Sequence, residues 1–278
     1  MRHFLGIFIL FSIFLKACNI GPYNRKNFQT LINDHPKITS QNIITNAKKS
    51  FYVFAQNKDL NAPLVVFIHG SPGGWEANAQ YLQDPDLLKV ANMISIDRYG
   101  YGQSDHVEYS QKLTTQSDAI KTIIEQYETA EKVILVGHSY SGPVIAKTGI
   151  DYPDLIDHLI FLAPAVDPKL ERTKWFQYPA QWPFIEPIVP KNLRESNNEI
   201  MALKDELESF ENQWDHIHAH ITVIQGKDDD LVPHENTAFI KEKRPKAEIL
   251  YLENQGHFLP WEQYDLVKAK ILEAISVE

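Results

Sequence analysis

The chain has 278 residues, of which 44% are hydrophobic and 23% are charged, a composition that excludes a disordered or fibrous protein. Its 27 Lys and Arg residues against 36 Asp and Glu residues give a formal charge of −9, so no overall positive field exists to hold a nucleic acid. The single cysteine, Cys18, excludes an intrachain disulfide and a zinc site built from thiolates.

The first 18 residues have the pattern of a signal peptide. Arg2 and His3 precede an apolar run at residues 4–15, which is shorter than the roughly 20 apolar residues that span a membrane. Cys18 follows directly and resembles the cysteine of the bacterial lipobox, which is lipidated and becomes the new N-terminus, although Lys16 departs from that pattern. We therefore expect an exported bacterial protein anchored to the cell envelope by lipid on Cys18. The alternatives are an ordinary cleaved signal with an incidental cysteine and an uncleaved anchor.

Residues 19–45 are polar and rich in Asn, Lys and Thr, which predicts a lead-in that acts as a tether. Further along, short apolar runs alternate with longer segments of helical periodicity. The apolar runs are predicted to be buried strands: residues 64–68, 93–96, 133–136, 159–162, 221–224 and 249–252. Residues 113–127 have apolar side chains on one helical face and predict a crossover helix. The alternation predicts an α/β fold with a mostly parallel central sheet flanked by helices.

The alternation is interrupted at residues 166–214, where no strand is predicted. Prolines are too dense in the first half of this interval for a regular helix. In the second half, Ser196 and Glu199 have the spacing of a capping box, and apolar residues then recur at helical spacing. We interpret residues 166–214 as a small, mainly helical cap between two parts of the core, residues 46–165 and 215–278. This cap is expected over the C-terminal edge of the sheet, where α/β folds bind ligands.

The segment around Ser139 is predicted to run from a strand through a sharp turn into a helix. A serine hydroxyl is a weak nucleophile unless a strained turn holds it clear of the backbone and beside a base, and such a turn needs small neighbours. Gly137 precedes the serine, and Ser141 stands where the G-x-S-x-G pattern has its second glycine, followed at once by Gly142. The spacing predicts a nucleophile elbow, and an incidental Gly-Ser turn is the structural alternative.

Four motifs, in this order along the chain, resemble the α/β-hydrolase superfamily over residues 50–278. They are the H-G-S-P-G-G loop at residues 69–74, the D-R-Y-G-Y-G-Q-S loop at residues 97–104, the elbow, and an acid loop followed by a terminal histidine. The resemblance implies that the backbone N–H groups of Ser71 and Tyr140 form an oxyanion hole, and it implies no cofactor.

The acid loop reads G-K-D-D-D-L-V-P at residues 226–233. In the superfamily pattern the acid lies three residues after the glycine and three before the Val-Pro pair, which selects Asp229. Its two aspartate neighbours are then expected to be solvated turn residues, with metal binding by the three as the alternative. His257, in the segment N-Q-G-H-F, resembles the terminal Gly-His motif. The resemblance thus implies a triad of Ser139, Asp229 and His257 in the chain order that this fold uses.

The remaining histidines are weighed as metal ligands or structural groups. His216, His218 and His220 alternate, so on a strand all three would point to one side and could bind zinc. No carboxylate pattern nearby supports a metal, and none is predicted. His69 and His138, which lie in the two loops around the nucleophile, are expected to order these loops rather than to catalyse.

The leading functional prediction is a serine hydrolase that cleaves a small ester, thioester or lactone through an acyl-enzyme. A proline-iminopeptidase-like amidase and a perhydrolase are alternatives within the superfamily, and a non-catalytic binding protein on the same fold is an alternative of another class. The expected partner is a small molecule and not a nucleic acid, and the expected membrane association is through the lipid alone. Trp175, Trp182 and Phe184 are predicted to wall an apolar acyl pocket under the cap.

Overall fold

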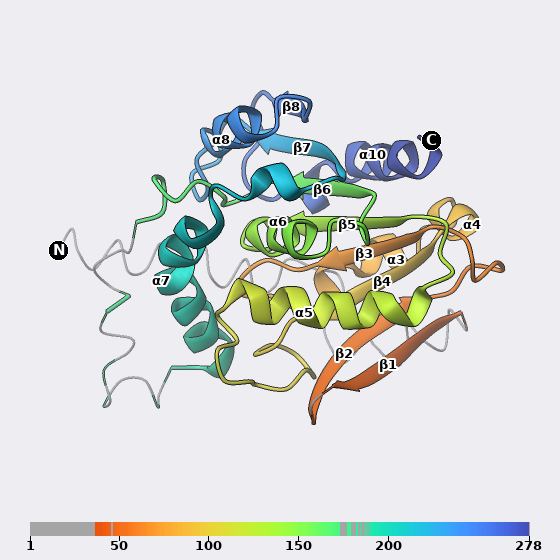
Figure 1. Ribbon diagram of the computed structural model, residues 1–278, viewed down its shortest axis with the longest axis horizontal. Helices are drawn as coiled ribbons and strands as arrows, with labels where there is room; N and C mark the ends of the chain where they lie inside the picture. The colour runs from red at the N-terminus through yellow and green to blue at the C-terminus, as the bar shows by residue number, and fades with distance from the viewer. Residues whose placement is uncertain are drawn as a thin grey trace.

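A computed structural model describes residues 37–45, 47–172, 177, 178, 182, 184, 187 and 189–277. Within these residues, eight strands form one sheet in the order β1-β2-β4-β3-β5-β6-β7-β8 (Figure 1). The pairs β1–β2 and β2–β4 are antiparallel, and every other neighbouring pair is parallel. The strands are β1 (Ile38–Thr45), β2 (Lys48–Ala55), β3 (Leu64–Ile68), β4 (Asn92–Asp97), β5 (Val133–His138), β6 (His158–Leu162), β7 (His220–Gly226) and β8 (Glu248–Leu252).

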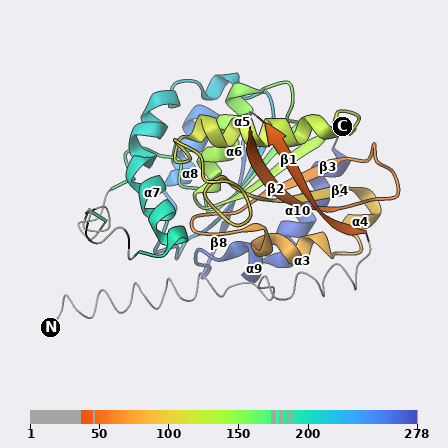
Figure 2. The same cartoon turned by 90° about the horizontal axis from the view of Figure 1, so that it is seen from below.

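Helices cover both faces of the sheet, and one further helix lies across an end of it (Figures 1 and 2). The helices are α3 (Ala79–Leu82), α4 (Leu87–Val90), α5 (Leu113–Ile124), α6 (Ser141–Asp151), α7 (Lys191–Phe210), α8 (Asn236–Lys243), α9 (Leu259–Glu262) and α10 (Tyr264–Ser276). Helices α5 and α6 lie on one face of the sheet, α3, α4 and α10 lie on the other, and α7 lies across the end (Figure 2). No helix in the described part of the chain is both long enough and apolar enough to cross a membrane.

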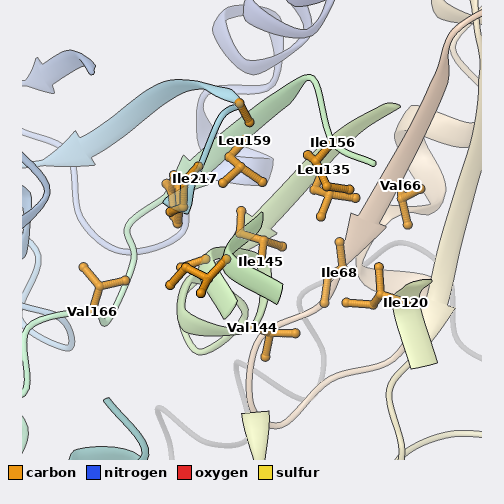
Figure 3. Close-up of a cluster of buried hydrophobic side chains, with 14 of the residues drawn as sticks. Val66, Ile68, Ile120, Leu135, Val144, Ile145, Ile156, Leu159, Val166 and Ile217 are labelled. Atoms are coloured by element: carbon orange, nitrogen blue, oxygen red, sulfur yellow. The ribbon is translucent and has the colours of Figure 1, made fainter. Parts of the chain in front are cut away.

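The central strand β3 is apolar throughout because both of its faces are covered. Val66 and Ile68 of β3 point toward Ile120 of α5 and Val144 of α6 (Figure 3), whereas Phe67 belongs to the cluster on the opposite face. Successive side chains of a strand point to opposite faces, so a strand between two helical layers favours apolar residues at every position. Burying each such side chain contributes about 1.5–3 kcal/mol. The predicted fold class, a mostly parallel sheet flanked by helices, is confirmed.

Strand β1 corrects the predicted lead-in. Residues 38–45 were expected to be part of a tether, yet they pair antiparallel with β2, from Ile38 opposite Ala55 to Thr45 opposite Lys48. An edge strand is paired on one side only, and most side chains of β1 are exposed, so its sequence lacks the apolar pattern of a buried strand. The predicted signal peptide at residues 1–18 and the rest of the lead-in up to residue 36 lie outside the described residues.

Helix α7 begins at Lys191, before the predicted capping box. Pro190 precedes it directly, and proline suits the start of a helix because the first N–H groups have no partner within the helix. Ser196 and Glu199 therefore lie inside the helix, where both side chains are buried. The capping-box interpretation is wrong, because these two polar residues make tertiary contacts instead of capping the helix.

Candidate active site

Ser139 lies in a sharp turn between β5 and α6, as the elbow pattern predicted. Its φ angle of +58° falls in the left-handed region that residues with a side chain rarely adopt. The Ser139 N–H donates to the carbonyl of Leu162 at 2.9 Å, and the Ser139 carbonyl accepts from the N–H of Gly142 at 2.9 Å. These bonds stabilise a strained backbone conformation of the kind found at functional sites.

The elbow shows why Ser141 is accepted where the usual pattern has glycine. The Ser141 hydroxyl lies 2.7 Å from the carbonyl oxygen of Ile68 and 2.9 Å from that of His138, so it links the ends of β3 and β5. The close approach occurs one residue later, since a Cβ on Gly142 would lie 2.6 Å from the Cβ of Pro164. Glycine is therefore required at position 142 rather than at position 141.

His257 and Asp229 form a buried pair. The Nδ1 atom of His257 lies 2.7 Å from Oδ2 of Asp229, and the two residues are 7% and 8% exposed. The other carboxylate oxygen of Asp229 accepts from the N–H groups of Leu231 and Val232 at 2.9 and 2.8 Å. Burial by itself would raise the pKa of Asp229, but the contact with His257 and these two N–H groups hold that pKa below its usual value. Both neighbouring aspartates are exposed, so only the aspartate selected by spacing reaches the histidine.

The loop after β3 lies against the nucleophile. A Cβ on Gly70 would lie 3.3 Å from the Cβ of Ser139 and 3.1 Å from the carbonyl oxygen of His138. Only a residue without a side chain fits this approach comfortably. Ser71 follows Gly70 directly, and Tyr140 follows Ser139 at the start of α6. The structure thus brings both predicted oxyanion-hole residues next to the elbow.

Two histidines, His69 and His138, order the loops around Ser139. Burial, followed by the neighbouring His257, lowers the pKa of His138 to about 3, so this ring is neutral and its Nε2–H donates to the carbonyl of His257 at 2.8 Å. Burial and Arg98 lower the pKa of His69 well below its usual value. The Nδ1–H of His69 donates to the carbonyl of Gly70 at 2.7 Å, and its Nε2 accepts from the N–H of Arg98 at 3.1 Å. These contacts agree with the expected loop-ordering roles.

The D-R-Y-G-Y-G-Q-S segment is a folded turn organised by its first residue. The Asp97 carboxylate accepts from the N–H groups of Trp75 at 2.9 Å and Gln103 at 2.7 Å. Gly102 has a φ of +56°, and a Cβ there would lie 1.8 Å from the Asp97 carboxylate. Ser104 closes the turn by donating to the Asp97 carbonyl at 2.6 Å. Asp97, Gly102 and Ser104 therefore hold the shape of the loop that follows β4.

A buried ion pair next to the site was not predicted from the sequence. Arg98 and Glu199 are each 1% exposed, and the guanidinium binds both oxygens of the carboxylate. The same carboxylate accepts from the hydroxyls of Ser71 and Tyr101, both at 2.7 Å. The only sequence signal was the Ser196–Glu199 spacing, which matched a capping box and was assigned to that local role.

Two of the three predicted pocket-wall aromatics, Trp182 and Phe184, are exposed in the structure. The side chains of Trp182 and Phe184 are 56% and 89% exposed, which contradicts the prediction that they wall an apolar pocket. Trp175 lies outside the described residues. The face of α7 that points inward combines apolar and polar side chains, namely Glu195, Ser196, Glu199, Leu203, Leu207 and Phe210.

The three alternating histidines lie in different surroundings. His216 belongs to a 3₁₀ turn (Trp214–His216), His218 lies 3.1 Å from the Asp154 carboxylate, and His220 begins β7 with its ring 5.9 Å from that of His158. Only His220 is on a strand, so the three side chains do not share a face. Within the described ranges, no group of three or more His, Cys, Asp and Glu side chains could hold a metal ion.

Comparison with known proteins supports the fold. Residues 63–195 match a family model described as alpha/beta hydrolase fold. The structure of 2-hydroxy-6-oxo-6-phenylhexa-2,4-dienoate hydrolase from Rhodococcus sp. strain RHA1 is similar, with a TM-score of 0.68 and 20% identity over 86% of this chain and 99% of that chain. The chain therefore has the α/β-hydrolase fold.

Curated relatives are similar over parts of their sequences. A Haemophilus influenzae protein assigned as an esterase/lipase is 30% identical over 165 residues, which is 56% of this chain and 49% of that protein. The proline iminopeptidase PfmaB of Pestalotiopsis fici is 22% identical over 257 residues, which is 76% of this chain and 91% of the relative. The chain spans about half the length of the Haemophilus influenzae relative. The activity of that whole protein is therefore not assigned to this chain.

Proposed function

We propose that the protein is a serine hydrolase that cleaves an ester, thioester or lactone of a small molecule through an acyl-enzyme. The observation that carries the proposal is the buried contact of 2.7 Å between His257 and Asp229. This pair adjoins the elbow, because His138, the residue before Ser139, donates to the backbone carbonyl of His257. An acid, a base and a strained serine turn thus meet at the C-terminal edge of the sheet.

The reaction follows from this arrangement. Asp229 holds the Nδ1–H of His257, which leaves Nε2 to accept the proton of Ser139 as the hydroxyl attacks the carbonyl carbon. The N–H groups of Ser71 and Tyr140 stabilise the negative oxygen that forms. His257 then returns the proton to the leaving group, which departs and leaves an acyl-enzyme. A water molecule repeats the same steps and releases the carboxylic acid.

Fluorophosphonate labelling combined with ester hydrolysis tests this proposal. We expect the wild-type protein to be labelled on Ser139, and Ser139→Ala to lose labelling and about 10⁴-fold or more in kcat. Absence of both labelling and hydrolysis in the correctly folded wild type would instead favour the non-catalytic binding protein.

An amidase is the second candidate, and one finding favours it. The match to the proline iminopeptidase covers 91% of that relative, far more than the match to the esterase/lipase. A series of aryl esters of increasing chain length, compared with aminoacyl arylamides, separates the two by kcat/KM. Higher kcat/KM on the arylamides would replace the esterase proposal with the amidase.

We also propose that the protein is exported and held at the cell envelope by lipid on Cys18, which lies outside the described residues. The support is the short apolar run at residues 4–15, followed three residues after its end by this cysteine. Mass spectrometry of the mature N-terminus after detergent extraction tests the idea. An unmodified peptide that begins downstream of Cys18 would contradict it.

A further inference from the structure

Arg98 holds the peptide group that carries the Ser71 N–H. One guanidinium nitrogen of Arg98 donates to the carbonyl of Gly70 at 2.9 Å, and its Nε donates to the carbonyl of His69 at 3.0 Å. The Gly70 carbonyl and the Ser71 N–H belong to the same planar peptide group. In a trans peptide these two groups point in opposite directions. Fixing the carbonyl therefore fixes the direction of the N–H.

The positive charge on Arg98 also acts on this peptide group electronically. A cation bound to a carbonyl oxygen draws electron density toward that oxygen, which makes the N–H of the same peptide a stronger donor. The Nδ1–H of His69 donates to the same carbonyl at 2.7 Å. Arg98 and His69 thus both donate to the carbonyl oxygen of the Gly70–Ser71 peptide. The N–H of the same peptide is left to donate to the developing oxyanion.

Glu199 of α7 holds both Arg98 and Ser71. Its Oε1 accepts from one guanidinium nitrogen of Arg98, and its Oε2 accepts from a second guanidinium nitrogen and from the hydroxyls of Ser71 and Tyr101. A carboxylate only accepts, so the Ser71 hydroxyl donates to it at 2.7 Å, and the Ser196 hydroxyl lies 3.0 Å from the same Ser71 oxygen. Glu199 is therefore bound to the loop at the side chain of Ser71 and, through Arg98, at its peptide group.

We infer that Glu199 and Arg98 are positioning residues for the oxyanion hole, because they orient and polarise the Ser71 N–H from the cap helix. The inference rests on the proposed serine hydrolase activity and deepens it. It assigns to α7 a part in the chemical step in addition to covering the site. A misdirected N–H donor stabilises the transition state less but changes substrate binding little. Loss of this positioning is therefore expected to lower kcat and to leave KM nearly unchanged.

The experiment compares three variants of the full chain. Glu199→Gln removes the charge that pairs with Arg98, and Ser71→Ala removes only the hydroxyl link and keeps the backbone N–H. The matched control is Glu195→Gln, because Glu195 lies one turn earlier on the same face and is 3% exposed, but it contacts Ser110 and His106 rather than the loop after β3. Each variant is measured for melting temperature, kcat, KM and inhibition by a trifluoromethyl ketone, whose adduct with serine carries an oxyanion.

We expect Glu199→Gln to lower kcat and the affinity for the ketone together by about 10- to 100-fold, with KM nearly unchanged. Ser71→Ala is expected to lower both by about three- to tenfold, and this variant tests the inference even where Glu199→Gln does not fold. Glu195→Gln is expected to lower the melting temperature but to keep kcat. Losses in Glu195→Gln equal to those in Glu199→Gln, or unchanged kcat and ketone affinity in both Glu199→Gln and Ser71→Ala, would overturn the inference. A wild-type protein without hydrolysis or labelling would refute the proposed function itself, which is a separate outcome.

Discussion

Three consecutive aspartates share one side-chain chemistry and differ in surroundings. Asp229 is buried against His257 and accepts two backbone N–H groups, whereas Asp228 and Asp230 are exposed. Spacing against a known motif was enough to select Asp229. The contacts that hold its pKa down come from the loop geometry and were not visible in the sequence.

The first prediction concerns this choice of acid. Asp229→Asn is expected to lower kcat by about 10⁴-fold, because an amide in this position favours the wrong tautomer of His257. Asp228→Asn and Asp230→Asn are the matched controls and should retain activity within about threefold of wild type, in line with the small effects of most surface substitutions. Steady-state ester hydrolysis measures all three, and a crippled Asp228→Asn beside an active Asp229→Asn would reassign the acid.

The second prediction concerns the elbow. Ser141→Gly restores the usual G-x-S-x-G pattern, yet we expect it to lower the free energy of unfolding by about 1–2 kcal/mol, because the hydroxyl contacts with Ile68 and His138 are lost at the first residue of α6. Urea denaturation checks the value. A variant as stable as wild type would show that these contacts contribute nothing net.

At the scale of elements, the sequence located β3 to β8 and α5, because each has the apolar pattern of its environment. It missed β1, whose side chains are mostly exposed, and also β2, although most side chains of β2 are buried. It placed the start of α7 too late. It also assigned the cap aromatics to a pocket wall, although Trp182 and Phe184 are exposed. Local patterns report burial and turn chemistry, but they cannot report which distant residue a polar side chain meets. The ion pair between Arg98 and Glu199 joins residues 101 positions apart, so no local pattern could have predicted it.

The third prediction concerns the contact between α7 and α5. The Glu206 carboxylate accepts from the N–H of Leu113, the first residue of α5, at 2.9 Å. A carboxylate at this position satisfies a free N–H group and interacts favourably with the helix dipole. We expect Glu206→Ala to lower the free energy of unfolding by about 1 kcal/mol.

Glu208→Ala is the matched control for this contact. Glu208 is on the same helix, and its side chain is 52% exposed with Lys204 as its ion-pair partner at 3.7 Å. Exposed pairs contribute little, so a change below about 0.5 kcal/mol is expected. Equal effects of the two substitutions in urea denaturation would contradict the capping role of Glu206.

At the scale of the whole molecule, stability is expected to depend on pH through buried histidines. Burial, and then the neighbouring His220, lowers the pKa of His158 to about 4, while Glu248 acts in the opposite direction. The ring lies 2.9 Å from the hydroxyl of Thr222, on the neighbouring strand. In the unfolded chain the ordinary pKa of histidine is about 6.5. Between these two values the unfolded state binds more protons than the folded state, so stability rises with pH and levels off above the higher value.

The fourth prediction follows from this window. His158→Gln removes the titrating group and keeps a side chain able to contact Thr222, so the slope of unfolding free energy against pH between about 4 and 6.5 should fall by up to about 1.4 kcal/mol per pH unit. Urea denaturation at several pH values measures the slope. An unchanged slope would mean that His158 takes up its proton equally in both states.

The pairing of Arg98 with Glu199 also bears on engineered chimeras in which the segment that contains α7 is replaced. A chimera that grafts another protein's cap onto this core keeps the guanidinium but loses its carboxylate unless the incoming helix supplies one. An uncompensated buried charge of this kind destabilises a protein by about 3–5 kcal/mol, a large share of the total stability of a domain. A stable chimera of this chain therefore needs an incoming segment that brings an acidic residue to Arg98, in the loop after β4, or a second substitution that removes the guanidinium.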